Sequence, residues 1–326
     1  MKLVFRRLSF LLGPLFLLII LTYVDLASLL GYLKGIKGQY IALAVAILFH
    51  FHLLKSLRWR RILSAQNIEL SFRNSYWMYL SALFWGLATP GRVGDFSKAW
   101  YLQRLGHKGG AAVACSLLDR MLDTAFLGAA GMVALVWLWI RVPDFHLFFV
   151  YALAISGFIF ILSLGGLVFF RLTRSRAVPA AVSAGRTTSA WRQLWHDFQH
   201  SFGQIPLLYW LEYVFLTLGT WLVYFLVVHL LVWSTRLELG LLETIFFFIV
   251  ATIAGLIPVS IAGIGTRDAC LVLLFKLYGR SSAEALAFSL CILFIYVVTA
   301  VFGLVAYSVW HGGGKGKPPP FPTNVR

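Results

Sequence analysis

The chain has 326 residues, of which 60% are hydrophobic and only 12% are charged. Soluble domains are usually about 45–50% apolar and about 25% charged, so this composition excludes a large water-exposed fold. The formal net charge of +16 comes from Lys and Arg residues at the ends of apolar segments, which favours membrane lipids as partners and excludes nucleic acid.

We predict that six apolar segments cross the bilayer as helices, a crossing that typically takes about 20 residues. In chain order they are Leu8–Leu30, Gln39–Leu54, Ala111–Ile140, Phe145–Phe170, Pro206–Trp233 and Ala285–Trp310. The first follows a basic N-terminus but exceeds the about 7–15 residues of a signal-peptide core, so we interpret it as an uncleaved span. The sequence therefore predicts an all-α polytopic membrane protein.

Two further apolar segments, at 75–106 and 241–280, are interrupted near their middles. Each returns after its break as a short apolar segment, Phe96–Leu105 in the first and Ala269–Tyr278 in the second. Proline removes a backbone donor and glycine permits unusual conformations, so we expect the residues of both breaks to act as hinges. These residues are Pro90, Gly91, Gly94, Pro258, Gly263 and Gly265.

The distribution of basic residues predicts the orientation of these segments. If both broken segments are re-entrant hairpins, 20 of the 28 Lys and Arg residues lie on one side of the membrane and 7 on the other, with Arg120 inside a span. The protein is expected in the inner membrane of a cell, and the positive-inside rule then places both termini and loop 171–205 on its cytoplasmic side. The same count also permits two full crossings by each broken segment.

The two hairpins enter from opposite sides, a pattern typical of transporters built from inverted repeats. Residues 1–310 are expected to form one membrane domain. Residues 311–326, which are rich in Gly, Lys and Pro, are expected to form a disordered cytoplasmic tail.

Two groups of motifs follow one another along the chain. The first joins 88–102 to 114–123, and the second joins 257–269 to 279–287. In this order they resemble the transmembrane domain family of lysylphosphatidylglycerol synthases, also called the flippase-like domain family, from about residue 5 to residue 310. Asp268 stands where many members of that family have Glu, which keeps the charge.

The resemblance implies a lipid translocation domain. We expect a stand-alone member, without the cytosolic aminoacyltransferase domain to which some members are fused. Stand-alone members are associated with varied lipids, including hopanoids and glycosylated lipid carriers, so the resemblance does not identify the substrate.

Seven charged residues lie in or beside the apolar segments, where an unpaired charge is costly. We expect them to bind the substrate: Arg92, Asp95, Asp119, Arg120, Asp123, Arg267 and Asp268. An arginine fork matches a phosphate group, and a broken helix offers free backbone N–H groups. Two alternatives stay open: a structural network that ties Asp119 and Asp123 to Arg92 or Arg267, and helix capping by Asp95 and Asp268.

All of these residues except Asp95, three of each sign, are expected to converge on one polar cavity between the hairpins. Such a cavity has no net charge, so an entering lipid phosphate must displace an acid from an arginine.

The sequence thus predicts a flippase or scramblase for a lipid with a polar headgroup that is anionic, aminoacylated or glycosylated. One alternative is an intramembrane transferase acting on a lipid carrier, with Asp119, Asp123 or Asp95 as its acid or base. Another is an accessory subunit of a lipid-synthesis complex. Besides lipids, the partners considered are a separate lipid-synthesis enzyme and a second copy of the chain.

We expect no catalytic residue, cofactor or metal. His50 and His52 are two residues apart and point to different faces of a helix, which makes a poor metal pair. The three cysteines lie in apolar segments and suggest small buried side chains: Cys115, Cys270 and Cys291.

Overall fold

The computed structural model describes residues 22, 24–142, 145–172, 205–257 and 260–312. Within these ranges the chain forms helices and no strand, which confirms the all-α prediction. In chain order the elements are α2 (Leu26–Lys34), α3 (Gly38–Ser64), α4 (Phe72–Leu87), the 3₁₀ segment η1 (Pro90–Phe96), α5 (Ser97–Arg104), α6 (Gly109–Arg141), α7 (His146–Leu172), α9 (Leu207–Ser234), α10 (Leu241–Gly255), α11 (Thr266–Leu277) and α12 (Ser282–Gly312).

Five helices are long and apolar enough to cross a membrane: α3, α6, α7, α9 and α12. They coincide with five of the six predicted spans. Helix α7 leaves large apolar side chains exposed, among them Phe158 and Ile161, as expected for a surface that faces hydrocarbon. The protein is therefore a multi-pass membrane protein.

The predicted span Leu8–Leu30 falls largely outside the described residues, and its described end differs from the prediction. Asp25 has an extended backbone, and its carboxylate accepts a hydrogen bond from the Ala27 amide at 3.0 Å. An aspartate in this position begins a new helix, so α2 is a separate element. Apolar composition alone could not reveal this boundary.

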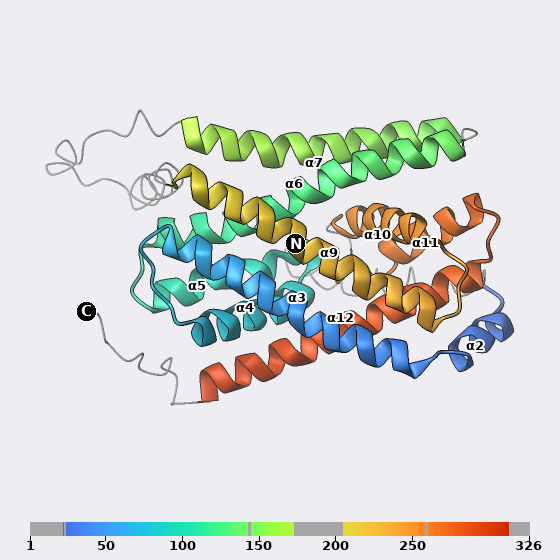
Figure 1. Cartoon of the computed structure of the whole chain (residues 1–326), viewed down its shortest axis with the longest axis horizontal. Coiled ribbons are helices and arrows are strands. Elements are labelled where there is room, and N and C mark those ends of the chain that lie inside the picture. Colours follow the sequence, from blue (N-terminus) through green and yellow to red (C-terminus); the bar gives the residue numbers. More distant parts are fainter. Residues whose placement is uncertain (1–21, 23, 143–144, 173–204, 258–259, 313–326) are drawn as a thin grey trace, which may run out of the picture.

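Both interrupted segments form helical hairpins at opposite ends of the bundle (Figure 1). The first hairpin consists of α4, η1 and α5, and it lies at the end where α3 finishes and α6 begins. The second hairpin consists of α10, α11 and the connection between them, and it lies at the end where α9 finishes and α12 begins. The two hairpins are thus oppositely oriented.

The packing of the helices also follows an inverted repeat. Each half contains a long helix, a hairpin and a second long helix, namely α3 to α6 and α9 to α12. The first arm of each hairpin packs against the second long helix of the other half, α4 against α12 and α10 against α6, while α3 packs against α9. Gly303 permits one of these contacts, because a Cβ there would lie 2.7 Å from the Leu80 carbonyl.

Candidate functional site

The first hairpin breaks because its backbone turns into the left-handed region. Gly91 and Arg92 have φ values of +61° and +57°. The Thr89 hydroxyl stabilises the turn: it donates to the Trp85 carbonyl at 2.9 Å and accepts from the Gly94 amide at 2.7 Å. A non-glycine residue with positive φ is uncommon, so this turn holds Arg92 in an unusual conformation that directs its side chain into the bundle.

The second hairpin contains a comparable turn. Ala262, Gly263 and Gly265 all have positive φ. A Cβ on Gly263 would lie 3.3 Å from the Cα of Gly255 and from the Cβ of Arg267, so this glycine lets the two arms approach. Arg267 consequently lies in the first turn of α11, inside the bundle, where it is 1% exposed.

A buried ion cluster joins α3 to α6. Arg58 is fully buried, and it donates from Nη2 to Asp119 Oδ1 at 2.7 Å and from Nη1 to Asp123 Oδ1 at 2.9 Å. The same Nη1 donates to the Thr217 hydroxyl at 2.8 Å, which links α9 to the cluster. Asp119 and Asp123 do share one helical face, as their spacing of four residues implies.

Two lysines complete this buried ion cluster. Lys55 forms an ion pair with Asp123. Lys98, on α5, forms an ion pair with Asp119 and lies over the Trp59 ring at 4.6 Å from its centroid. Of the alternatives left open, a structural ion network does hold the two acids, but its cations are Lys55, Arg58 and Lys98 and not Arg92 or Arg267.

In the count of basic residues, Lys55, Arg58 and Lys98 are three of the 20 placed on the cytoplasmic side of the membrane. The structure continues α3 to Ser64, so Lys55 and Arg58 lie inside the bundle with exposed fractions of 4% and 0%. The available signal was the helical spacing of Lys55, Arg58, Trp59 and Ile62, which places all four on one face. A hydropathy criterion ends the span before this face because it penalises the charges.

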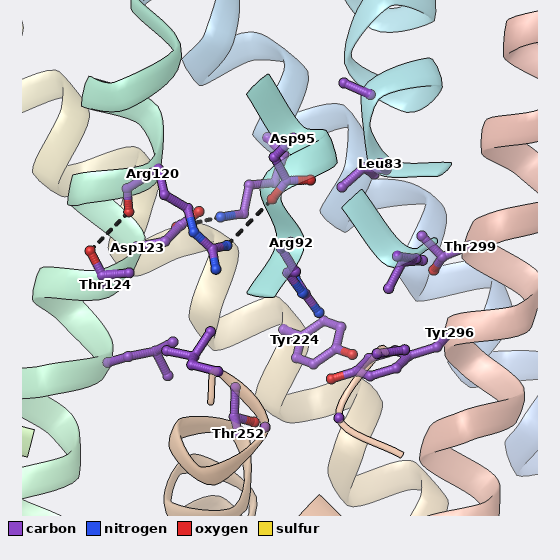
Figure 2. Close-up of a pocket in the computed structure, with 18 of the residues that line it drawn as sticks. Leu83, Arg92, Asp95, Arg120, Asp123, Thr124, Tyr224, Thr252, Tyr296 and Thr299 are labelled. Atoms are coloured by element: carbon purple, nitrogen blue, oxygen red, sulfur yellow. Dashed lines mark hydrogen bonds and ion pairs between the residues drawn. The ribbon is translucent and has the colours of Figure 1, made fainter. Parts of the chain in front are cut away.

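Arg92 and Arg267 face the same aromatic ring. The guanidinium carbon of Arg92 lies 5.6 Å from the centroid of Tyr296, and that of Arg267 lies 5.2 Å from it. Figure 2 shows Arg92 directed toward Tyr224 and Tyr296, whose hydroxyls point toward each other. Arg120 reaches toward Asp95 and forms an ion pair with it at 3.4 Å.

These groups line a cavity of about 110 Å³ between the two hairpins. That volume accommodates several waters or a small polar headgroup. Its charged lining consists of five cations and three acids: Lys55, Arg92, Lys98, Arg120, Arg267, Asp95, Asp119 and Asp123. Arg58 and Asp268 do not line the cavity themselves but contact the lining residues Asp119 and Arg267, respectively, and they add one charge of each sign. The cavity is therefore positive, and the predicted neutral cavity is wrong because it omitted the buried lysines.

Six of the seven predicted site residues line this cavity, and Asp268 does not. The Asp268 carboxylate accepts hydrogen bonds from the Gly265 amide at 2.8 Å and from Arg267 Nη2 at 2.8 Å, and it also accepts one from the Ser289 hydroxyl. It thus caps α11 and positions Arg267, whereas Asp95 pairs with Arg120.

The predicted hinge residues also differ in whether they line the cavity. Gly91 and Gly263 line the cavity, and Pro90 begins η1. Gly94 packs so closely on the Trp85 carbonyl that a Cβ would overlap it. Pro258 lies outside the described residues. Contact of any of these residues with a substrate stays a prediction.

Comparison with known proteins places the chain among membrane proteins. The profile of the family described as the lysylphosphatidylglycerol synthase TM region matches residues 8–303. The UPF0104 membrane protein MJ1595 of Methanocaldococcus jannaschii is 21% identical over 322 residues, which cover 90% of this chain and 91% of that protein.

Proposed function

The chain belongs to the family of lysylphosphatidylglycerol synthase transmembrane regions, and we propose that it moves a lipid with an anionic headgroup between the leaflets of the membrane. The observation that carries this proposal is the positive cavity between two oppositely oriented hairpins. Cations buried among apolar helices are costly, and they usually mark a substrate or ion pathway. A lipid phosphate is an abundant anion at the membrane surface, and it reaches the depth of this cavity only if the protein admits it.

The position of the cavity supports lipid movement. It is lined by α3, α6, α9 and α12 together with both hairpins, so residues from both halves of the inverted repeat contribute. In transporters with inverted repeats, the substrate lies where the halves meet, and rocking of one half opens the site to the other side. The same rearrangement here would carry a headgroup past the apolar core.

The basic residues support an orientation with both termini in the cytoplasm of an inner membrane. Within the part of the chain that the structure describes, five of these basic residues are buried or line the cavity, four from the cytoplasmic 20 and one from the outer seven: Lys55, Arg58, Arg92, Lys98 and Arg267. The remaining 16 against 6 keep the bias that the positive-inside rule requires.

The transferase alternative has weaker support. An acid or base catalyst must be free to exchange a proton with its substrate. Asp119 and Asp123 each contact two cations, which stabilises their charged forms and removes them from that role. Asp95, which is paired with Arg120 at 3.4 Å, is the remaining acid in the cavity.

Leaflet exchange in liposomes tests the proposal. The purified chain is reconstituted with fluorescent lipids that differ in headgroup: anionic, zwitterionic, aminoacylated, glycosylated and neutral. We expect faster loss of fluorescence to a membrane-impermeant quencher for anionic lipids than in protein-free liposomes. Exchange at the protein-free rate for every lipid would reject the transport function.

A further inference from the structure

Arg92 differs from every other cation that lines the cavity. Within the described ranges Lys55, Lys98, Arg120 and Arg267 each form an ion pair with an aspartate, whereas no carboxylate pairs with Arg92. Its guanidinium instead faces the Tyr296 ring. A cavity-lining cation that is partnered by an aromatic face retains most of its capacity to bind an anion.

Arg267 is only partly satisfied. Its Nε and Nη2 donate to Asp268 Oδ1 at 3.2 and 2.8 Å, and Nη2 is also 3.2 Å from the Ser289 hydroxyl. Its Nη1 is buried and has no hydrogen-bond partner among the described residues. Buried guanidinium donors are normally paired, so this orphaned group indicates a missing acceptor.

The two arginines come from different hairpins and meet at one side chain. Arg92 belongs to η1 of the first hairpin, and Arg267 belongs to α11 of the second. Both lie within cation–π distance of Tyr296. Both arginines line the cavity, so an acceptor bound in it can contact both hairpins at once, and the hydroxyls of Tyr224 and Tyr296 lie beside Arg92 (Figure 2).

We propose that Arg92, the free Nη1 of Arg267 and the hydroxyls of Tyr224 and Tyr296 form a binding site for one phosphate group, shared between the two hairpins. A phosphate presents oxygens in several directions, so it can accept from arginines that approach from two sides. A carboxylate has its acceptors in one plane and is satisfied by a single arginine fork. No acid has to be displaced, because Arg92 has none.

This site deepens the proposed function and rests on it, since it names phosphate as the chemical group that the transporter recognises. A phosphate bound here links the two hairpins. The group could belong to a lipid or to a free phosphate ion, and binding measurements distinguish these sources.

The test is isothermal titration calorimetry of the full chain in detergent with three ligands. Short-chain phosphatidic acid and the matching diacylglycerol differ only in the phosphate, and inorganic phosphate lacks the lipid. We expect saturable binding of phosphatidic acid and none of diacylglycerol. If inorganic phosphate competes with phosphatidic acid, the phosphate group alone is recognised. If inorganic phosphate does not compete, the acyl chains contribute to binding as well. Both outcomes support the site.

Variants locate the binding. Arg92→Gln removes a cation that has no ion pair, so it should leave the fold intact and weaken phosphatidic acid binding by about tenfold or more. Arg92→Lys keeps the charge without the fork and should fall in between. Arg141→Gln is the matched control, because Arg141 lies 3.7 Å from the Trp137 ring centroid at the end of α6 and does not line the cavity.

Arg267→Gln should act like Arg92→Gln, but it also leaves Asp268 without its cation, so Arg92→Gln decides the question if the Arg267 variant fails to fold. Equal binding of phosphatidic acid by wild type and Arg92→Gln, or equal binding of phosphatidic acid and diacylglycerol, would overturn the site. Binding is measured without leaflet exchange, so the site can hold even if transport fails, and transport can hold if the site fails.

Discussion

Replacing Asp119 by Asn should destabilise the fold far more than any exposed charge change. Asp119 is 4% exposed and accepts hydrogen bonds from Arg58 at 3.1 and 2.7 Å. It also holds the Lys98 ammonium, which is itself 4% exposed. Asparagine keeps the shape of the side chain but removes the charge. Arg58 then keeps only Asp123 of its two acids, and Lys98 loses the aspartate with which it pairs.

The expected magnitude follows from burial. Breaking a buried ion pair by neutralising one partner costs about 3–5 kcal/mol, because the remaining charge stays uncompensated. The pair Arg61–Glu212 is the matched control, since its side chains are 50% and 37% exposed and separated by 3.5 Å. Neutralising an exposed pair costs about 0–1 kcal/mol.

Unfolding in detergent, followed by circular dichroism as denaturing detergent is added, measures both free energies. Asp119→Asn should lose about 3–5 kcal/mol of unfolding free energy, and Glu212→Gln about 0–1 kcal/mol. Adding Lys98→Met to Asp119→Asn should recover part of the loss, because the second change removes one uncompensated cation. Equal, small losses for the two single variants would refute the buried ion cluster.

Three other predictions concern the hairpins, α2 and the topology. Gly94→Ala should destabilise the protein more than Gly106→Ala in the same unfolding assay. A Cβ at position 94 would overlap a backbone carbonyl, whereas a Cβ at position 106 would meet open space. The change at Gly106 therefore adds only the strain of a left-handed backbone, about 1–2 kcal/mol. The Ser28 hydroxyl, and after it the Ala27 amide, hold the pKa of Asp25 below its ordinary value. The stability that this cap gives α2 is therefore present above the ordinary pKa and is lost as pH falls through the lowered pKa. Hydrogen-exchange protection of the α2 amides should therefore drop at acid pH in the wild type and not in Asp25→Asn; the same drop in both would contradict the assignment. A cysteine at Lys34 should react with an impermeant reagent added to intact cells, whereas one at Lys315 should react only after the cells are opened. Reaction of the second cysteine in intact cells would invert the topology.

The fold was predictable from the sequence where apolar length and helix breakers report it. Hydropathy located the five long helices, and the Pro/Gly breaks located both hairpins because few residues tolerate positive φ. The separate helix α2 was missed, since a single capping residue, Asp25, decides that boundary inside an apolar run.

The candidate site was predictable only in part. Charges inside apolar segments, such as Asp119 and Arg267, stand out because they are costly there. Arg58 lies beyond the apparent end of its span among other basic residues, so it resembles a loop cation until α3 is seen to continue. The role of Tyr296 depends on two arginines that are 175 residues apart in the sequence, a relation that only the fold reveals.

Lipid is proposed to pass through the cavity between the hairpins. Thr252 lines that cavity and hydrogen-bonds only its own helix, so a cysteine there can carry a bulky maleimide once Cys115, Cys270 and Cys291 are replaced by serine. The measurement is the leaflet-exchange rate in liposomes before and after labelling, with a cysteine at Gly106 as the control outside the cavity. We predict that labelling stops exchange for Thr252→Cys and leaves it unchanged for Gly106→Cys; an unchanged rate with the cavity blocked would contradict the account.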